Sequence, residues 1–141
     1  MYKDILLTVD LSDSKGQQKA TEVAVDLAEK FGCRLHVCTV VPDYGMSIVG
    51  DFFPKAYEKK ALEHVNATLH EWTRDHISAG ISVQHIVGHG TIYSEILRYA
   101  GETKCDLIVM ASHRPGLEDY LLGPNAARVV RHAKMSVLVV R

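Results

Sequence analysis

Short apolar runs alternate with amphipathic segments along this chain. Apolar runs that contain β-branched residues occupy positions 5–9, 35–41, 81–87, 107–111 and 136–140. Their length and composition are typical of strands that are buried on both faces, as in a parallel sheet. Between them, apolar residues recur at helical spacing near 20–31, 55–78, 92–100 and 126–133. The pattern therefore predicts the element order βαβαβαβαβ.

This order predicts an α/β fold built on a doubly wound parallel sheet of five strands. Because parallel neighbours need helical crossovers, helices are expected on both faces, in a three-layer α/β/α arrangement. The 141 residues contain no Pro/Gly/Ser-rich linker, charge block or internal repeat. We therefore expect one domain that spans residues 1–141, which is an ordinary size for a domain.

Polar residues at 10–14 separate the first strand from the first helix. An aspartate at such a place often only caps the following helix or turn. Here Asp13 or Ser14 can act as the cap, which leaves Asp10 available for a ligand. Gly32 follows the last apolar position of this helix, where glycine commonly ends a helix.

Charge is balanced, with 16 Lys and Arg against 17 Asp and Glu. A protein that binds nucleic acid through a broad surface is normally basic, so no nucleic-acid partner is expected. Any anion site must therefore be local.

Cysteines and apolar segments indicate the compartment. Cys33, Cys38 and Cys105 are odd in number and form no CxxC pair, which favours reduced, buried thiols. The sequence has no export signal and no apolar run near the roughly 20 residues that span a bilayer. We therefore expect a cytoplasmic protein without membrane insertion.

Eight histidines raise the question of a metal site. His64, His70 and His76 recur every six residues, so successive rings on a helix point about 120° apart and cannot meet at one ion. We expect no metal centre and solvated histidines. Gly88 and Gly90 flank His89 ahead of a helix, and a tight turn is the expected role because a lone G-x-G is weak evidence for a dinucleotide site.

The carboxyl ends of the predicted strands are the expected place for a ligand, because open parallel sheets bind ligands there. The segment 111–128 is the strongest candidate. Gly123 lets the backbone approach a ligand, and Pro124 suits the first helical position. The N–H groups of Asn125 and Ala126 and the charge of Arg114 would then serve a phosphate. A solvated loop capped by Gly-Pro explains these residues equally well.

The same segment resembles the carboxyl-terminal motif of the universal stress protein family, G-x2-G-x9-G-[S/T]. The run Leu-Ile-Val-Met-Ala-Ser-His at 107–113, the ending 130–140 and the opening Ile-Leu-Leu-Thr-Val-Asp at 5–10, with Ser12, resemble the family too. The string Ala-Ser-His-Arg-Pro followed by Tyr-Leu-Leu-Gly is most similar to its F-type branch. The resemblance spans the whole chain and is strongest over 106–141.

The resemblance implies strand order 3-2-1-4-5, a homodimer paired through the last strand and, in one subclass, bound ATP. The expected ligand is ATP or another adenine nucleotide, with or without Mg²⁺. By position, Asp10 would face the nucleoside and backbone groups at Val40 would read the base, with Met110 and Ala111 near ribose and base. The residues implied at the nucleotide are Asp10, Val40, Met110, Ala111, Arg114, Gly123, Pro124 and Asn125.

The motif departs from the family pattern where phosphate would bind. Ala111 and Arg114 replace its first two glycines, and eight residues instead of nine separate Arg114 from Gly123. Pro124 replaces the Ser/Thr and offers neither a hydroxyl nor an N–H. These losses are expected to weaken phosphate binding by about 1–3 kcal/mol, and charge-assisted bonds from Arg114 to offset the loss.

The sequence thus predicts a regulatory stress-response module that binds adenine nucleotide. No general base, P-loop or magnesium-binding carboxylate pair is found at the predicted phosphates, so fast turnover is not expected. Two alternatives stay open: a slow ATPase, and a dimeric interaction protein that does not bind nucleotide. Phe52, Phe53 and Tyr57 either form a flap over the base or anchor the long helix.

Overall fold

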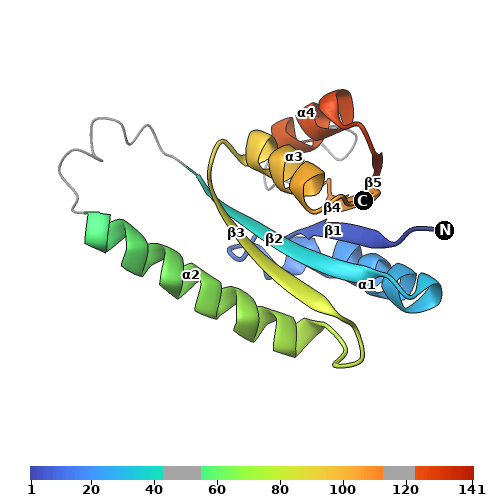
Figure 1. Cartoon of the computed structure of the whole chain (residues 1–141), viewed down its shortest axis with the longest axis horizontal. Helices are drawn as coiled ribbons and strands as arrows, with labels where there is room; N and C mark the ends of the chain where they lie inside the picture. Colours follow the sequence, from blue (N-terminus) through green and yellow to red (C-terminus); the bar gives the residue numbers. More distant parts are fainter. Residues whose placement is uncertain (43–54, 113–122) are drawn as a thin grey trace.

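The computed structural model describes residues 1–42, 55–112 and 123–141 and contains one parallel sheet (Figure 1). Its strand order is β3-β2-β1-β4-β5, which confirms the order implied by the family resemblance. The strands are β1 (Asp4–Thr8), β2 (Arg34–Pro42), β3 (Val83–Gly90), β4 (Leu107–Ala111) and β5 (Ser136–Val140). The helices are α1 (Ser14–Phe31), α2 (Lys55–His76), α3 (Ile92–Glu102) and α4 (Pro124–His132).

Two helices cover each face of the sheet, as the three-layer prediction requires. One core cluster joins the strands to α1 and α2 and includes Ala24, Leu69 and Trp72. The second joins them to α3 and α4 and includes Ile96 and Val129. The alternation of side chains along each strand supplies one residue to each cluster in turn.

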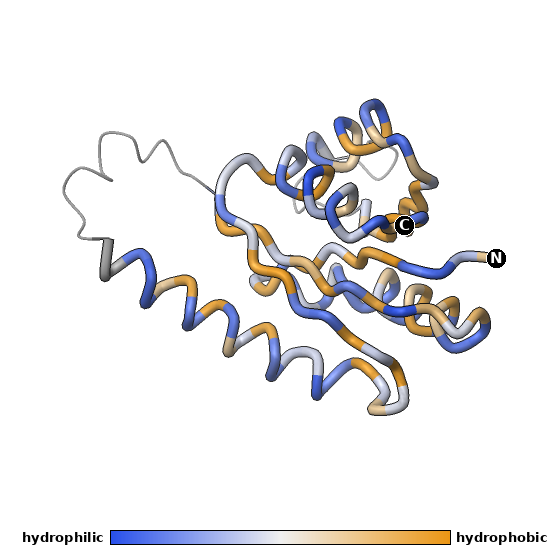
Figure 2. Tube along the Cα trace, in the orientation of Figure 1, coloured by the Kyte–Doolittle hydropathy of each residue, from blue (hydrophilic) through white to orange (hydrophobic). Residues whose placement is uncertain are grey.

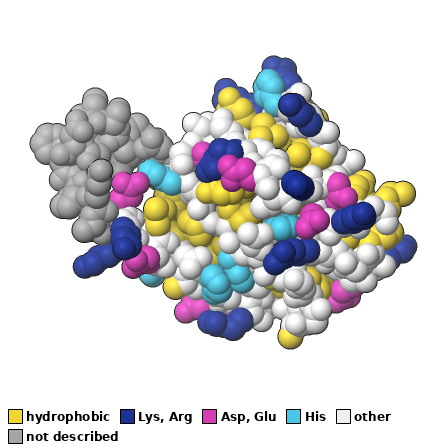
Figure 3. All heavy atoms as spheres, viewed as in Figure 1, with side chains coloured by type: hydrophobic (Ala, Val, Ile, Leu, Met, Phe, Trp, Pro, Cys, Tyr) yellow, Lys and Arg dark blue, Asp and Glu magenta, His cyan; other side chains and the backbone are white. Residues whose placement is uncertain are grey.

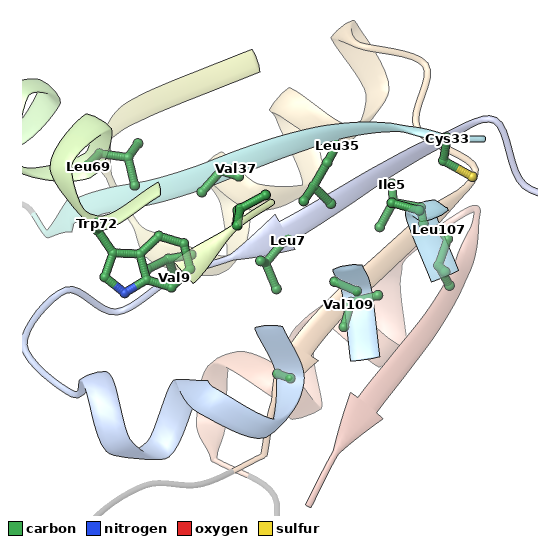
Figure 4. Close-up of a cluster of buried hydrophobic side chains, with 14 residues drawn as sticks. Ile5, Leu7, Val9, Cys33, Leu35, Val37, Leu69, Trp72, Leu107 and Val109 are labelled. Carbon is green, nitrogen blue, oxygen red and sulfur yellow. The ribbon is translucent and has the colours of Figure 1, made fainter. Parts of the chain in front are cut away.

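Hydropathy follows this layering. The tube in Figure 2 is mostly orange along the central strands and alternates in colour along α2, so the strands are apolar on both faces and the helix on one. Figure 4 shows Ile5, Leu7 and Val9 in one cluster with Leu69 and Trp72 of α2. Trp72, 7% exposed, is therefore part of the core.

Both ends of α1 agree with the sequence. Asp13 is the N-cap, and its carboxylate accepts a hydrogen bond from the Gly16 N–H at 3.1 Å. Gly32 is the C-cap with φ 65°, a left-handed conformation that favours glycine. Phe31 is 36% exposed and contacts Tyr2 edge-on instead of joining the core.

The Gly88–Gly90 segment differs from the prediction, which was wrong in making it a tight turn. Both glycines belong to β3, which pairs with β2 as far as Pro42 and Gly90. A Cβ on Gly88 would lie 2.9 Å from Cε2 of Tyr99, so α3 packs against the bare backbone. Gly90 has φ 136°, a conformation that side chains rarely adopt.

The histidine prediction was also wrong in part. His36 is 3% exposed; its Nε2 lies 2.8 Å from Asp4 Oδ1 and its Nδ1 lies 2.6 Å from Gln84 Oε1. His70 and His85 are half-buried and stacked, with ring centroids 3.7 Å apart. The partners of His36 are 32 and 48 residues away in sequence, so only pairing of the strands brings them together.

Cys33, Cys38 and Cys105 are free and buried, which confirms the expected thiols. Burial raises the pKa of the Cys38 thiol to about 12 and that of Cys105 to about 11, so both are protonated at neutral pH. Across the described helices, none combines the length and apolar character that crossing a membrane requires.

Candidate functional site

A cavity of about 650 Å³ opens at the carboxyl end of the sheet. This volume is within the range of small-molecule sites. Its walls come from the ends of β1, β2 and β4, the turn after β1, the amino-terminal parts of α1, α3 and α4, and Val65 of α2. Its position between β1 and β4, where the strand order reverses, is where a doubly wound sheet binds ligands.

Seven of the eight residues predicted at the nucleotide line this one cavity. They are Asp10, Val40, Met110, Ala111, Gly123, Pro124 and Asn125. Arg114 lies outside the described residues, as do Phe52 and Phe53, and nothing is described of the Tyr57 side chain.

Asp10 is exposed at the cavity, and Ser12 holds its carboxylate. Oδ1 accepts hydrogen bonds from the backbone N–H of Ser12 at 2.9 Å and from its hydroxyl at 2.5 Å. Within residues 1–42, 55–112 and 123–141, Oδ2 has no hydrogen-bond partner. Because Asp13 is the helix cap, Asp10 offers a fixed, negatively charged acceptor to the cavity.

Val40 contributes backbone groups, because β2 continues past the end of β1. The last described hydrogen bond between these segments runs from Val9 N–H to the Cys38 carbonyl at 2.8 Å. In a parallel strand, alternate residues face the same neighbour, so the N–H and C=O of Val40 face the space beyond Val9. No hydrogen bond joins them to the described residues of the β1–α1 turn.

Met110 and Ala111 end β4 on opposite faces of the sheet. Met110 packs in the cluster under α3 and α4, and Ala111 packs against the cluster under α1 and α2. Since both line the cavity, it reaches around the end of β4 and has an apolar wall on each side.

α4 presents its first turn to the cavity. Gly123 is the N-cap without a side-chain cap, and Pro124 takes the first helical position, as predicted. Gly123 has φ −59°, so its backbone conformation does not require glycine. The position is buried, and glycine suits it because it has no side chain to accommodate. The N–H groups of Asn125 and Ala126 precede the first intrahelical bond, which Ala127 donates to Gly123 O at 3.0 Å. Both residues line the cavity, so these two donors are available to a phosphate oxygen that enters it.

Sequence reasoning missed Gln17, which lines the cavity and is 6% exposed. Its side-chain amide donates to the Thr8 carbonyl at 3.0 Å and accepts from the Asp10 N–H at 3.3 Å. The available signal was its position: Gln17 continues the buried stripe of Ala20, Ala24 and Ala28 into the first turn of α1. A polar residue on an apolar stripe normally has specific hydrogen bonds.

The charged side chains described in the cavity wall are acidic. Asp10 and Asp13 are the carboxylates that line it, and the described part of the chain contains no cluster of three side chains able to hold a metal ion. On the face seen in Figure 3, basic and acidic side chains are interspersed. The arrangement can therefore hold a ligand by hydrogen bonds and apolar contact. Cys38 lines the cavity too, but its raised pKa keeps the thiol protonated and unreactive.

Comparison with known proteins decides the family. Residues 1–141 match the universal stress protein family over the full chain. The chain belongs to this family. It is 30% identical to universal stress protein G of Escherichia coli O157:H7, over 147 aligned positions that cover all of both chains. The resemblance to the F-type branch stays a prediction, since this relative carries the letter G.

Solved structures of universal stress proteins and related proteins have the same fold. The structure of hypothetical protein MJ0577 gives a TM-score of 0.75 at 24% identity, covering 99% of this chain and 96% of the other. A universal stress protein in complex with cAMP gives 0.63 at 22% identity, covering 99% and 97%. The Archaeoglobus fulgidus protein in complex with dAMP gives 0.61 at 18% identity, covering 99% and 98%.

Proposed function

We propose that this universal stress protein binds ATP or another adenine nucleotide in the carboxyl-end cavity and acts as a regulatory stress-response module. The observation that carries the proposal is the convergence of seven predicted residues, from four separate segments of the chain, on one cavity of suitable volume. The cAMP and dAMP held by proteins of the same fold support the choice of an adenine nucleotide.

The nucleoside would bind between β1, β2 and β4. The N–H and C=O of Val40 match the acceptor and donor on the edge of adenine, and Met110 and Ala111 supply apolar surface for base and ribose. The fixed carboxylate of Asp10 would accept a hydrogen bond from the nucleoside.

The phosphates would bind at the start of α4. Gly123 gives close approach, Asn125 offers a backbone N–H, and Pro124 offers none. Arg114 would add charge-assisted hydrogen bonds. Because Asp13 caps α1 and Asp10 holds Ser12, Mg²⁺ would depend on phosphate oxygens for most of its ligands.

Mass spectrometry of small molecules released from the purified protein tests the proposal directly. Calorimetry with ATP, ADP, AMP and cAMP, with and without Mg²⁺, then ranks the ligands. Arg114→Ala is expected to lower ATP affinity by about tenfold, the value of one charge-assisted bond. Arg74→Ala, which removes the same charge from an exposed position on α2, is the control. Equal affinity in the wild type and Arg114→Ala would remove Arg114 from the site.

We also propose that two copies pair through β5. This strand is at the edge of the sheet, and an edge strand has one row of unpaired backbone groups. Leu138 on β5 and Val130 on α4 are 36% and 47% exposed, which favours an apolar contact there. Leu138→Lys should shift the mass measured by light scattering toward the monomer. Phe31→Lys, at an equally exposed apolar position on α1, should not.

Two features of the proposal are tested by simple assays. We propose a cytoplasmic location, which cell fractionation checks.

A dimeric interaction protein without nucleotide is the second candidate, favoured by Pro124, which removes one donor from the phosphate site. No bound nucleotide after purification and no thermal shift with ATP would favour this second function, and turnover above background that is lost in a site variant would favour a slow ATPase.

A further inference from the structure

Gln17 is a buried polar side chain next to the proposed nucleoside site. It is 6% exposed, lines the cavity and lies on the face of α1 that packs against the sheet. A buried amide without hydrogen-bond partners would destabilise the folded protein, so a buried polar side chain normally has specific partners. Its two partners are backbone groups: the carbonyl of Thr8, which ends β1, and the N–H of Asp10, two residues later.

The two halves of the Gln17 amide clamp one short stretch of backbone. Nε2 donates to the Thr8 carbonyl at 3.0 Å, and Oε1 accepts from the Asp10 N–H at 3.3 Å. These backbone groups lie beyond the last β1–β4 pair, between Leu7 and Val109, so the sheet does not hold them on that side. The amide therefore takes the place of the missing strand partner.

Ser12 completes the support of Asp10 from the other side. It fixes the carboxylate through Oδ1, whereas Gln17 fixes the peptide group of the same residue. With the backbone and one carboxylate oxygen held, the direction of Oδ2 is set before a ligand arrives. Such preorganisation strengthens a hydrogen bond, because no freedom is lost on binding.

We propose that Gln17 is a positioning residue, which aims the Asp10 carboxylate at a hydrogen-bond donor of the bound nucleoside. The inference rests on the proposed function. Two groups of adenosine have the required chemistry, a ribose hydroxyl and the exocyclic amine of the base. Both donate to a carboxylate oxygen, and ligands that lack one or the other distinguish them.

Calorimetry with three ligands tests the inference. AMP carries both donors, 2′,3′-dideoxy-AMP lacks the ribose hydroxyls, and purine riboside monophosphate lacks the amine. In the wild type, the analogue without the donor bound by Asp10 should bind roughly tenfold more weakly than AMP, since one hydrogen bond to a charged group is lost. Because the Val40 carbonyl is also expected to bind the amine, the donor to Asp10 is identified by the analogue whose affinity ratio to AMP changes in the Gln17 variants.

In Gln17→Met, AMP should bind roughly tenfold more weakly, and the ratio between AMP and the weaker analogue should fall to about twofold or less. A residue that only stabilised the fold would lower the affinity for all three ligands together and leave this ratio unchanged. Gln18→Met is the matched control, because Gln18 is exposed and, among the described residues, its side chain bonds only to Glu22, at 3.0 Å. It should preserve both affinity and ratio.

A second variant covers poor folding of Gln17→Met. Gln17→Glu keeps an oxygen acceptor for the Asp10 N–H but loses the donor to Thr8, so it should lower the ratio less than Met does. An unchanged ratio in either folded variant, or a wild type that binds AMP and both analogues equally, overturns the positioning role. A wild type that binds neither these three ligands nor ATP, ADP or cAMP overturns the proposed function instead, so the two failures are distinguishable.

Discussion

The two ends of the sheet use similar polar side chains in different ways. At the amino end, the Asp106 carboxylate accepts from the backbone N–H groups of Lys3 and Asp4. His36 bonds to Asp4 and to Gln84. At the carboxyl end, Asp10 is held by its neighbours but keeps one oxygen without a described partner. Paired polar groups therefore join strands at the amino end. At the carboxyl end, the polar group is held in place but keeps an acceptor without a described partner beside the cavity.

The difference follows from what surrounds each end. At the amino end, neighbouring strands also join through their backbones: the Asp106 N–H donates to the Asp4 backbone carbonyl at 3.0 Å, and the Arg34 N–H donates to the Lys3 backbone carbonyl at 2.9 Å. The carboxyl-end groups lie where β1 and β4 separate toward opposite crossovers, which leaves space. Residue type alone does not separate a structural aspartate from a ligand-binding one.

The largest expected effect is at the amino end. His36→Ala removes a buried ring and leaves Asp4 and Gln84 without their partner, so the free energy of unfolding should fall by about 2–3 kcal/mol. Urea denaturation measures the loss, and calorimetry should find AMP affinity within about twofold of the wild type. His64→Ala, at an exposed position on α2, should change stability by less than about 0.5 kcal/mol. A parallel loss of AMP affinity would show that the two ends are not separate.

The reverse pattern is expected at the carboxyl end. Asp10→Asn keeps an oxygen for the Ser12 N–H but removes the charge, so AMP affinity should fall about 10- to 100-fold. The free energy of unfolding should change by less than about 0.5 kcal/mol. Asp26→Asn, the same change at an exposed position of α1, should alter neither quantity. Unchanged affinity in Asp10→Asn would remove this residue from the site.

A smaller effect on stability should distinguish Asp13 from Asp10, the other aspartate in the cavity wall. Asp13→Ala removes the N-cap of α1 and should lower the free energy of unfolding by about 1 kcal/mol. AMP affinity should stay within about twofold, because the Asp13 side chain is committed to the Gly16 N–H. Ser14→Ala tests the other candidate cap and should be nearly neutral. A destabilising Ser14→Ala with a neutral Asp13→Ala would reassign the cap.

The smallest effect is expected midway between the ends, at His85. Burial, and then the nearby His70, lower the pKa of His85 below its usual range, while its Nε2 lies 3.1 Å from Thr73 Oγ1. The folded state then binds fewer protons than the unfolded state, so stability falls as the pH drops through about 6.5 and levels off below the lowered pKa.

Urea denaturation at pH 7.5 and pH 5 measures this effect. His85→Gln should lose less stability than the wild type over this interval, by less than about 1 kcal/mol, because the half-buried ring is partly screened by solvent. AMP affinity at pH 7.5 should be unchanged, because His85 does not line the cavity. His64→Gln is the control. An equal or steeper loss in His85→Gln would contradict the assignment.

Much of the fold was predictable because each element has a local signal. The apolar runs at 107–111 and 136–140 are β4 and β5 to the residue, and Gly32 ends α1 as expected. The predictions were wrong at the ends of strands and at residues whose role depends on a neighbouring strand. β3 extends through Gly88 to Gly90 because β2 pairs with it, and neither strand carries that information alone.

The candidate site was predictable in part for a similar reason. Asp10, Gly123 and Pro124 follow strand ends or precede a helix, and the rule for doubly wound sheets directs attention to such places. Gln17 was missed because its partners are backbone groups, Thr8 O and Asp10 N–H, which have no signature in sequence.

The sequence by itself determined the alternation of strands and helices, the glycine that ends α1, the proline that begins α4, the balanced charge and the family motif with its substituted positions. These properties depend on residues near one another in the chain. Tertiary structure alone decided that Asp4 is paired with His36, that one oxygen of Asp10 has no partner among the described residues, and that Gln17 links α1 to the end of β1. The physical reason is that hydrogen-bond pairing and burial depend on neighbours in space, and the strand crossovers bring those neighbours from distant parts of the chain.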